Sequence, residues 1–302
     1  MSAPQAGARG WLGLAALAVM WGSAFAVTKS AVETVPPGGV AFGRLVLGAL
    51  ILAVYALARG RRFPPLADPR WRWFAALGLF GNALPFYLIA AGQQHVASAV
   101  AGILLGAMPL ATIAMAHFVI PGDRLTFGKS LGFLTGFAGV VILMGPAALA
   151  GLGADLVAQL MILGGGVSYA INAILAQRAP TMPPSLSAAG MLVGAAVLAA
   201  PMGIWELSRI EAAPDARALA AVAWLGIVPT AIAAIIYMEV ARSIGASFIA
   251  QVNYLVPLVA AFVGVVLGEA LTLTTFLALA VILLGLAIAR RGSRPRPAAR
   301  RD

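Results

Sequence analysis

The feature that most constrains this chain is its succession of long apolar segments joined by short polar connections. A helix needs roughly 20 predominantly apolar residues to cross about 30 Å of hydrocarbon. Segments of this kind recur at residues 11–29, 38–58, 73–92, 96–120, 127–145, 156–177, 186–206, 218–240, 245–268 and 271–290. We therefore predict an all-α integral membrane protein with ten transmembrane helices.

Composition supports this prediction and excludes several kinds of site. Apolar residue types make up 62% of the 302 residues and charged types only 10%, whereas a soluble domain carries about 25% charged residues. The sequence contains no cysteine and only two histidines, His95 and His117. Disulfides, thiolate metal sites and cysteine nucleophiles are therefore excluded, and we expect neither a metal site nor a cofactor.

The distribution of positive charge predicts the orientation of the chain. The net charge is +10, but the basic residues lie in short connections and in the tail, which argues against a nucleic-acid partner. Most of the 20 lysines and arginines fall on one side of the predicted spans; the exceptions are Lys29, Arg209, Arg217 and the intramembrane Arg44. Because such an excess marks the cytoplasmic side, we predict a bacterial inner-membrane protein with both termini in the cytoplasm. The first apolar run is expected to be a retained helix and not a cleaved signal peptide.

The two halves of the chain match at an offset of 148 residues. Trp21 aligns with Tyr169, Lys29 with Gln177, Gly78 with Gly226, Ala97 with Gly245 and Pro109 with Pro257, and GDRLT at 122–126 aligns with GEALT at 268–272 after a two-residue slip. Each half holds five predicted spans, and five is odd. The second half must therefore enter the membrane upside down, which is the inverted-topology duplication common in secondary transporters.

This duplication sets the predicted domain organisation. We expect a cytoplasmic N-terminus at 1–10, a first five-helix repeat at 11–145, a linker at 146–154, a second repeat at 155–291 and a basic cytoplasmic tail at 292–302. The tail is expected to be disordered and attracted to anionic lipid. A duplication with a purely structural purpose is the alternative.

Three motifs carry a resemblance to a known family. They are WGSAFAVTK at 21–29, the arginine-bearing AFGRLVLGALIL at 41–52, and the GDRLT and GEALT segments that close the fourth and ninth spans. With these motifs the whole chain resembles the ten-span, EamA-like family of the drug/metabolite transporter superfamily. The resemblance implies export or exchange of amino acids, in some relatives aromatic ones, or of nucleobases and similar solutes. It also implies a central cavity lined mainly by spans 1, 3, 4, 6, 8 and 9.

Aromatic and polar residues at helical spacing mark candidate substrate-binding positions in those spans. They are Trp21 and Phe25 in span 1, Asn82 and Phe86 in span 3, Tyr169 and Asn172 in span 6, and Gln251 and Tyr254 in span 9. Together they predict an aromatic-walled cavity with a few amide and hydroxyl groups, suited to a small amphipathic or zwitterionic solute. The alternative is that the amides bridge helices and the aromatic rings only pack.

Prolines inside four of these spans are candidate hinges: Pro85, Pro109, Pro229 and Pro257. Each removes a backbone donor and frees a carbonyl, so each marks either a kink that faces the cavity or an ordinary bend. Glycines spaced by four, at 102 and 106, at 128, 132 and 136, and at 264 and 268, predict close helix packing within the bundle, with dimerisation as the alternative. We do not expect the chain to require an oligomer.

The charged residues bear on what is transported. Arg44 either has a structural role, snorkels to the surface or holds a substrate carboxylate. Lys29 with Glu33, and Glu239 with Arg242, are expected to form pairs. Because no acidic residue lies at the middle of a predicted span, we doubt strong proton coupling and expect a neutral or zwitterionic solute.

Three other functions are alternatives to amino-acid transport. Export of drugs or nucleobase-like solutes remains open within the same fold. A membrane-embedded lipid-modifying enzyme would need a cluster of acidic, histidine or serine side chains near an interface, and the sequence shows no such cluster. A channel does not require an inverted duplication, and no ring of charges is evident.

Overall fold

The structure is a computed structural model that describes residues 7–120, 125–150 and 154–292, and within these ranges the chain forms helices and connections without a strand. The helices of the first half are α1 (Ala8–Ala31), α2 (Pro37–Ala58), α3 (Arg70–Gly78), the π-helix η1 (Leu79–Ala83), α4 (Leu84–Gln93), α5 (Ser98–Leu105), α6 (Met108–Val119) and α7 (Phe127–Ala150). Those of the second half are α8 (Ala154–Arg178), α9 (Pro184–Leu207), α10 (Ala216–Leu225), the π-helix η2 (Gly226–Ile232), α11 (Ala233–Ile244), α12 (Ala246–Ile249), α13 (Val252–Val266) and α14 (Leu273–Gly292).

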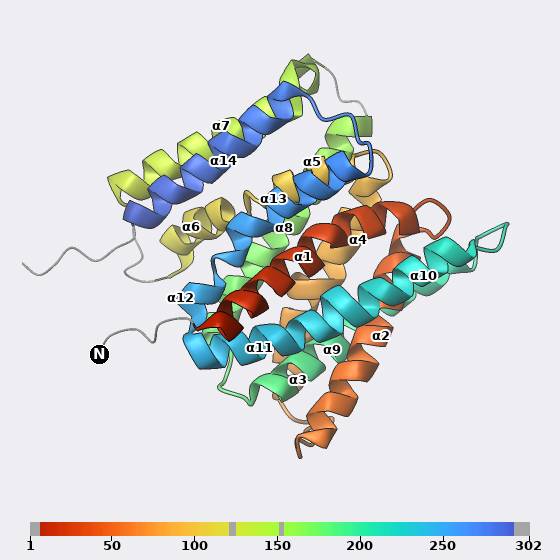
Figure 1. Cartoon of the computed structure of the whole chain (residues 1–302). Helices are drawn as coiled ribbons and strands as arrows, with labels where there is room; N and C mark the ends of the chain where they lie inside the picture. Colours follow the sequence, from red (N-terminus) through yellow and green to blue (C-terminus); the bar gives the residue numbers. More distant parts are fainter. Residues whose placement is uncertain (1–6, 121–124, 151–153, 293–302) are drawn as a thin grey trace, which may run out of the picture.

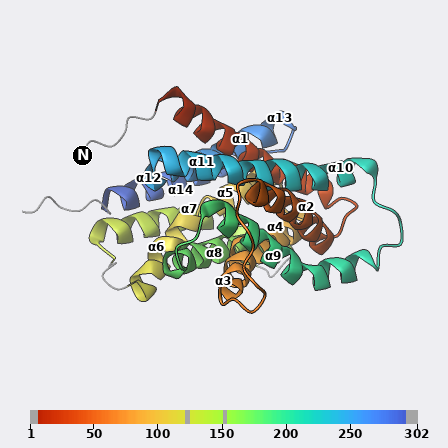
Figure 2. The same cartoon turned by 90° about the horizontal axis from the view of Figure 1, so that it is seen from below.

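These helices form the predicted spans. Among the described residues, nine spans are long and apolar enough to cross a bilayer, and α13 is a shorter apolar helix within the predicted span 245–268. Two spans are composite, because α3 continues through η1 into α4 and α10 continues through η2 into α11 (Figures 1 and 2). The predicted all-α membrane fold is confirmed. Of the predicted linker, residues 146–150 instead extend α7 beyond a kink at Gly145, and residues 293–302 of the predicted tail lie outside the described residues.

Contacts between span ends show that successive spans alternate in direction. At one end, which we call the basic end, Trp11 packs edge-on against Phe248 with ring centroids 5.0 Å apart, and Arg178 Nη2 donates to Val119 O at 2.8 Å. The start of α1 and the end of α14 both lie at this end (Figure 1). The first half therefore begins at the basic end and the second half begins at the other, as the odd number of spans requires.

Contacts at the other end, which we call the opposite end, complete this alternation. Gly38 N donates to Glu206 Oε2 at 2.6 Å, and Lys29 Nζ donates to Gln93 O at 2.7 Å. These residues lie in the last turns of spans 1, 3 and 7 and in the first turn of span 2. All of them are expected on that side when spans alternate.

Small residues let the helices approach closely. A Cβ atom added at Gly132 would lie 2.4 Å from Ala289 N, and one added at Gly285 would lie 2.3 Å from Gly136 N, so α7 and α14 touch through their backbones. One added at Gly102 would lie 2.3 Å from Ala260 Cβ. The predicted use of spaced glycines for packing inside the bundle is therefore confirmed at Gly102, Gly132 and Gly136.

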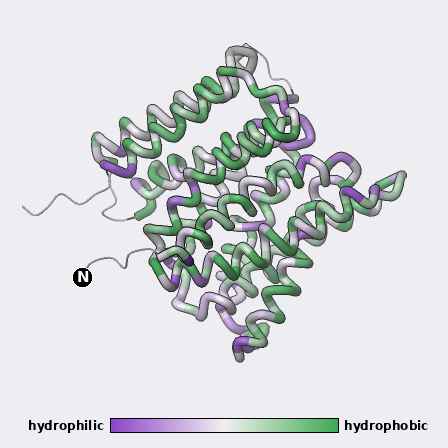
Figure 3. Tube along the Cα trace, viewed as in Figure 1, coloured by the Kyte–Doolittle hydropathy of each residue, from purple (hydrophilic) through white to green (hydrophobic). Residues whose placement is uncertain are grey.

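The outer surface is suited to lipid. Apolar residues follow the helices, whereas hydrophilic residues gather at the helix ends and connections (Figure 3). Large apolar side chains such as Val54, Phe262 and Leu134 remain 66%, 68% and 62% exposed on helices that cross the bundle. An apolar surface of this extent would be unfavourable in water and is favourable against hydrocarbon. The chain is a multi-pass membrane protein.

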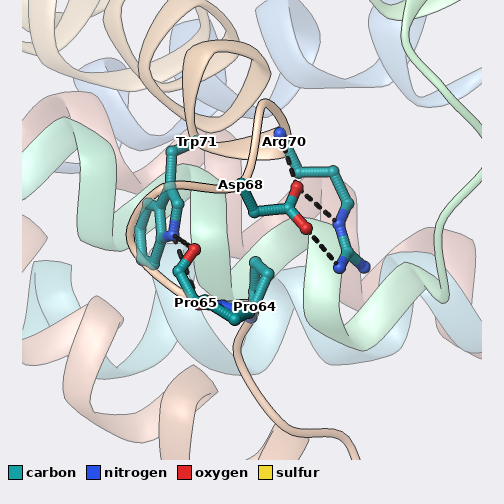
Figure 4. Close-up of polar contacts among 5 residues, drawn as sticks. All are labelled: Pro64, Pro65, Asp68, Arg70 and Trp71. Atoms are coloured by element: carbon teal, nitrogen blue, oxygen red, sulfur yellow. Dashed lines mark hydrogen bonds and ion pairs between the residues drawn. The ribbon is translucent and has the colours of Figure 1, made fainter.

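A compact connection joins α2 to α3 at the basic end (Figure 4). The Arg70 side chain donates to both carboxylate oxygens of Asp68, at 2.9 and 2.7 Å, and Trp71 Nε1 donates to Pro65 O at 3.1 Å. Hydrogen bonds from Arg70 hold the pKa of the Asp68 carboxyl at about 2, below its ordinary value. A carboxyl with a lowered pKa stabilises the fold above its ordinary pKa, so this pair is intact at neutral pH and is lost only as the pH falls towards 2.

Candidate functional site

Arg44 is a buried cation inside the bundle. It lies seven residues into α2, about 10 Å along the helix axis, and only 8% of its surface is exposed. Its Nη2 and Nε atoms donate to Thr230 Oγ1 at 3.0 and 3.3 Å, and its guanidinium lies 3.6 Å from the centre of the Phe86 ring. The snorkelling alternative is therefore wrong, because the side chain points into the protein and not towards the surface.

A proline explains why Thr230 can serve Arg44. In an α-helix the N–H of residue 229 would bond to the carbonyl of Leu225, but Pro229 has no N–H. The hydroxyl of Thr230 donates to Leu225 O at 2.8 Å. With its proton committed there, the Thr230 oxygen is left as an acceptor for the Arg44 guanidinium. Sequence reasoning missed Thr230, and the signal that would find it is a hydroxyl residue directly after a mid-span proline.

The two π-helices occupy equivalent places in the two halves. Gly78, which precedes η1, aligns with Gly226, the first residue of η2. Each π-helix receives a hydrogen bond from the other half: Trp21 Nε1 donates to Pro229 O at 3.0 Å, and Ser168 Oγ donates to Phe80 O at 2.8 Å. A π-helix shifts the backbone hydrogen-bond register and often marks a functional site. Here the register shifts coincide with the contact between halves.

Several predicted binding residues gather around these elements. Trp21 contacts Pro229, Phe86 lies under Arg44, and Tyr169 interacts electrostatically with Arg44. Asn172 packs against η1, where a Cβ atom at Gly81 would lie 2.8 Å from its side chain. We call Arg44, Phe86, Tyr169, Asn172 and Thr230 the Arg44 cluster.

The remaining predicted binding residues lie elsewhere. Asn82 is part of η1 and is the repeat equivalent of Thr230. Phe25 is buried, and its carbonyl accepts a hydrogen bond from Gln93 Nε2 at 2.8 Å. Gln251 and Tyr254 belong to a separate pocket, so the structure does not bring all eight predicted residues into one place.

That pocket lies at the basic end between α1, α13 and α14. Its volume is about 440 Å³, and its lining consists of Trp11, Leu14, Gln251, Tyr254, Leu255, Ala287, Arg290 and Arg291. Trp11 precedes Trp21 by ten residues on α1, which is about 15 Å along a helix axis. The pocket therefore lies closer to the basic end than the contact between Trp21 and Pro229.

Spans 4 and 9 lie together at the opposite end and separate towards the basic end. At the opposite end α5 packs on α13. Towards the basic end, α6 packs on α7 and α8, whereas α12 packs on α11 (Figure 1). Both spans are interrupted, span 4 at Gly106 and Ala107 and span 9 at Ala250 and Gln251. The apolar runs gave no sign of these breaks.

The predicted hinge prolines fall at or near irregular backbone. Pro85 and Pro109 lie in the first turns of α4 and α6, directly after η1 and after the break in span 4. Pro229 lies within η2, and Pro257 lies inside α13. A Cβ atom at Gly106 would lie 2.7 Å from Pro257 Cγ, so Pro257 packs where span 4 breaks.

At the opposite end the two halves are joined by hydrogen bonds. Besides the bond from Gly38 to Glu206, the backbone N–H groups of Ser98 and Ala99 donate to the two Glu269 carboxylate oxygens at 2.8 and 2.9 Å. Glu269 thus satisfies free donors at the start of α5. Its predicted equivalent, Asp123, lies outside the described residues.

The two predicted ion pairs have different outcomes. The pair between Glu239 and Arg242 is confirmed at 3.3 Å, on the surface near the end of α11. The pair between Lys29 and Glu33 was wrong. Lys29 reaches across to the end of α4 and donates to the carbonyls of Gln93 and Gln94 at 2.7 and 3.2 Å, because those carbonyls end a helix and accept a cation well.

Comparison with known proteins gives the family. The EamA-like transporter family matches residues 8–145 and 156–291, one copy in each half. The chain is 29% identical over 286 residues to the uncharacterized inner membrane transporter YedA of Escherichia coli K12, covering 92% of this chain and 90% of that protein. It is 23% identical to the uncharacterized transporter YvbV of Bacillus subtilis 168, covering 95% and 93%.

A solved crystal structure of a protein covers 96% of this chain and 100% of its own, with a TM-score of 0.67 and 24% sequence identity, and so shares the fold. The family matches once in each half and so accounts for nearly the whole chain, in agreement with the internal repeat. This chain belongs to the EamA-like transporter family and is a membrane transporter.

Proposed function

We propose that the chain is a secondary transporter that exports or exchanges a small neutral or zwitterionic metabolite across a bacterial inner membrane by alternating access. Amino acids, aromatic ones included, are the substrate class we favour. The observation that carries this proposal is the unequal closure of the two ends. At the opposite end Glu206 and Glu269 each accept backbone hydrogen bonds from the first half. At the basic end, where Arg178 still donates to Val119 O, spans 4 and 9 separate and a pocket of about 440 Å³ lies between α1, α13 and α14.

The proposed cycle follows from the duplication. Two related halves in opposite orientations can exchange conformations, so a site between them faces each side in turn. In this cycle the contacts from Gly38 to Glu206 and from Ser98 to Glu269 would break while spans 4 and 9 close at the basic end. The lipid bilayer and one small solute are the only partners that this cycle needs, and a single chain suffices.

The test is counterflow in proteoliposomes. The purified protein would be reconstituted and loaded with unlabelled amino acids, nucleobases or cationic drugs, and uptake of the labelled solute would be followed with and without a pH gradient. We expect saturable counterflow of one or more amino acids. Counterflow of drugs or nucleobases alone supports the runner-up substrate class. Uptake that does not saturate indicates a channel, and chemical change of the solute or of lipid indicates an enzyme.

Orientation needs its own test. Reporter tags inserted near Arg62 and Arg178 and at the C-terminus are expected on the cytoplasmic side, because lysine and arginine concentrate there. Tags near Arg62 and Arg178 on opposite sides of the bilayer would contradict two inverted halves.

A further inference from the structure

We propose that the Arg44 cluster is the substrate site, in which Arg44 binds a carboxylate and Asn172 accepts a hydrogen bond from an ammonium group. This proposal rests on the transport function above and adds the residues that recognise each end of an α-amino acid or a similar zwitterion. It also assigns Arg44, for which the sequence left a structural role, snorkelling and carboxylate binding open.

The first argument is the incomplete pairing of a buried charge. Among the described residues no carboxylate lies within ion-pair distance of Arg44, whose hydrogen bonds go to the single oxygen of Thr230. A guanidinium carries five donors, and none from Nη1 bonds to a residue in the described part of the chain. A charge inside a membrane bundle is costly unless it is paired, so this arrangement favours an anionic ligand.

The second argument is an acceptor that lacks a donor. Asn172 Oδ1 is buried and has no hydrogen-bond partner among the residues that the structure describes. Buried polar atoms of this kind call for a specific explanation, of which an absent ligand is one. Asn172 lies three residues after Tyr169 on α8, so both side chains share a helix face. Asn172 packs against Gly81 of η1, and Phe86, five residues further along the same span, stacks on the Arg44 guanidinium, which connects the acceptor to the cation.

The third argument is the asymmetry of the cluster. The repeat equivalent of Thr230 is Asn82, which is also polar, but the equivalent of Arg44 is Leu192. The positive charge is therefore on one side of the pseudo-symmetric interface only. A zwitterion then has one preferred orientation, with its carboxylate towards α2 and its ammonium towards α8. A solute with a lone positive charge is disfavoured, because Arg44 repels it.

Phe86 adds an apolar contact to this arrangement. Its ring already stacks on the guanidinium at 3.6 Å from centroid to Cζ. Because the guanidinium is held over the ring, the orientation of its remaining N–H donors is fixed before a ligand binds. Trp21 reaches the same region through its bond to Pro229. These rings provide apolar surface near the Arg44 guanidinium for an apolar or aromatic side chain of the substrate.

The test compares each amino acid with its amide, which lacks the carboxylate. L-phenylalanine, L-leucine and L-threonine, and the three corresponding amides, would compete for counterflow of whichever solute the wild-type protein transports. We expect the acids to compete and the amides to compete at least about 10-fold more weakly, as loss of a charged hydrogen-bonded pair implies. Equal competition by acids and amides, or competition by cationic drugs alone, would overturn this proposal while leaving the transport function intact. Absence of any counterflow would overturn the transport function itself.

Variants assign the effect to Arg44. Arg44→Gln is expected to abolish the difference between acid and amide, whereas a merely structural role would weaken both equally. Arg44→Lys keeps the charge and should keep part of the preference. Arg242→Gln, which removes an exposed arginine at the end of α11, is the matched control and should leave the preference unchanged.

A second measurement needs no variant. Thermal unfolding of the wild-type protein in detergent is expected to shift upwards with each transported acid and not with its amide, because a ligand stabilises the state that binds it. Asn172→Ala tests the other anchor. It should weaken competition by the acids more than competition by deaminated analogues such as phenylpropionate. An equal effect on both would remove Asn172 from the site.

Discussion

At the scale of single residues, the informative contacts are hydrogen bonds in which a donor in one half meets an acceptor in the other half. Trp21 donates to Pro229, Arg44 to Thr230, and Ser98 and Ala99 to Glu269. Aromatic and charged residues inside spans could be singled out from the sequence, because such residues are rare or costly there. Thr230 was missed, because a threonine in a helix ordinarily satisfies itself on the preceding turn, and only its place directly after Pro229 marks it. Glu269 could be placed at a helix end, but its partners lie in the other half of the chain.

Replacing Trp21 by phenylalanine should shift the balance between the two proposed conformations. The ring remains, but the hydrogen bond to Pro229 O is lost. A hydrogen bond of this kind contributes about 0.5–1.5 kcal/mol, so the conformational equilibrium should change by roughly 2- to 10-fold. Because the chain has no cysteine, a single Gln251→Cys can report access to the basic-end pocket through its rate of maleimide labelling. Trp205→Phe, at an exposed tryptophan on α9, should leave the labelling rate unchanged.

Replacing Glu269 by alanine should lower stability. Two N–H groups at the start of α5 lose their acceptors, and a favourable charge at a helix N-terminus is removed. The expected loss is about 1–2 kcal/mol, measured as a lower melting temperature in detergent, with Glu269→Gln intermediate. Glu211→Ala, in an exposed connection, serves as the control. Equal melting temperatures for Glu269→Ala and the control would show that this cap is energetically unimportant.

At the scale of helices, the departures from regular geometry are concentrated in spans 3, 4, 8 and 9. The apolar runs predicted that these spans exist, because span length depends only on bilayer thickness and composition. They could not predict η1, η2 or the two breaks, because those depend on which neighbour satisfies a displaced backbone group. The prolines pointed to the right spans. They did not show that the equivalent Pro109 and Pro257 differ, one opening α6 after a break and the other lying inside α13.

Replacing Pro229 by alanine should preserve folding but reduce transport. The restored N–H can bond to Leu225 O and displace the Thr230 hydroxyl, which then no longer has a fixed orientation for Arg44. We expect counterflow to fall several-fold with an unchanged or higher melting temperature, since alanine favours a helix more than proline does. Pro201→Ala, at an exposed proline inside α9, is the matched control. If both variants transport equally well, the proline at 229 has no role beyond bending its helix.

At the scale of the whole molecule, the arrangement is set by an odd number of spans repeated twice. Because five spans is an odd number, the sequence predicted that the two halves enter the membrane from opposite sides, and the contacts at both ends agree with this prediction. The predicted single cavity was less accurate, since Gln251 and Tyr254 line a pocket away from the Arg44 cluster. Which residues share a space depends on the tilt and crossing of helices, and spacing along one helix does not contain that information.

Access to the opposite end should depend on transport. Ala99 is fully buried where α5 meets α13, with Gly264 directly beside it. A single Ala99→Cys should be protected from an impermeant maleimide at rest and should become reactive from the opposite side when a transported solute is supplied. Trp205→Cys on the exposed surface of α9 should react at a rate that the solute does not change. Labelling of Ala99→Cys that ignores the solute would contradict alternating access.

The separation of Arg44 from Thr230 along the chain has a consequence for biosynthesis. The two residues are 186 positions apart, so a ribosome that adds about 5–20 residues per second completes Thr230 roughly 10–40 s after Arg44. Phe86 is made much sooner and can hold the guanidinium over its ring in the interval. A nascent chain that stops after its first half therefore carries a cation without its hydroxyl partner in the lipid. Quality-control proteases are expected to remove such fragments faster than they remove the full-length protein.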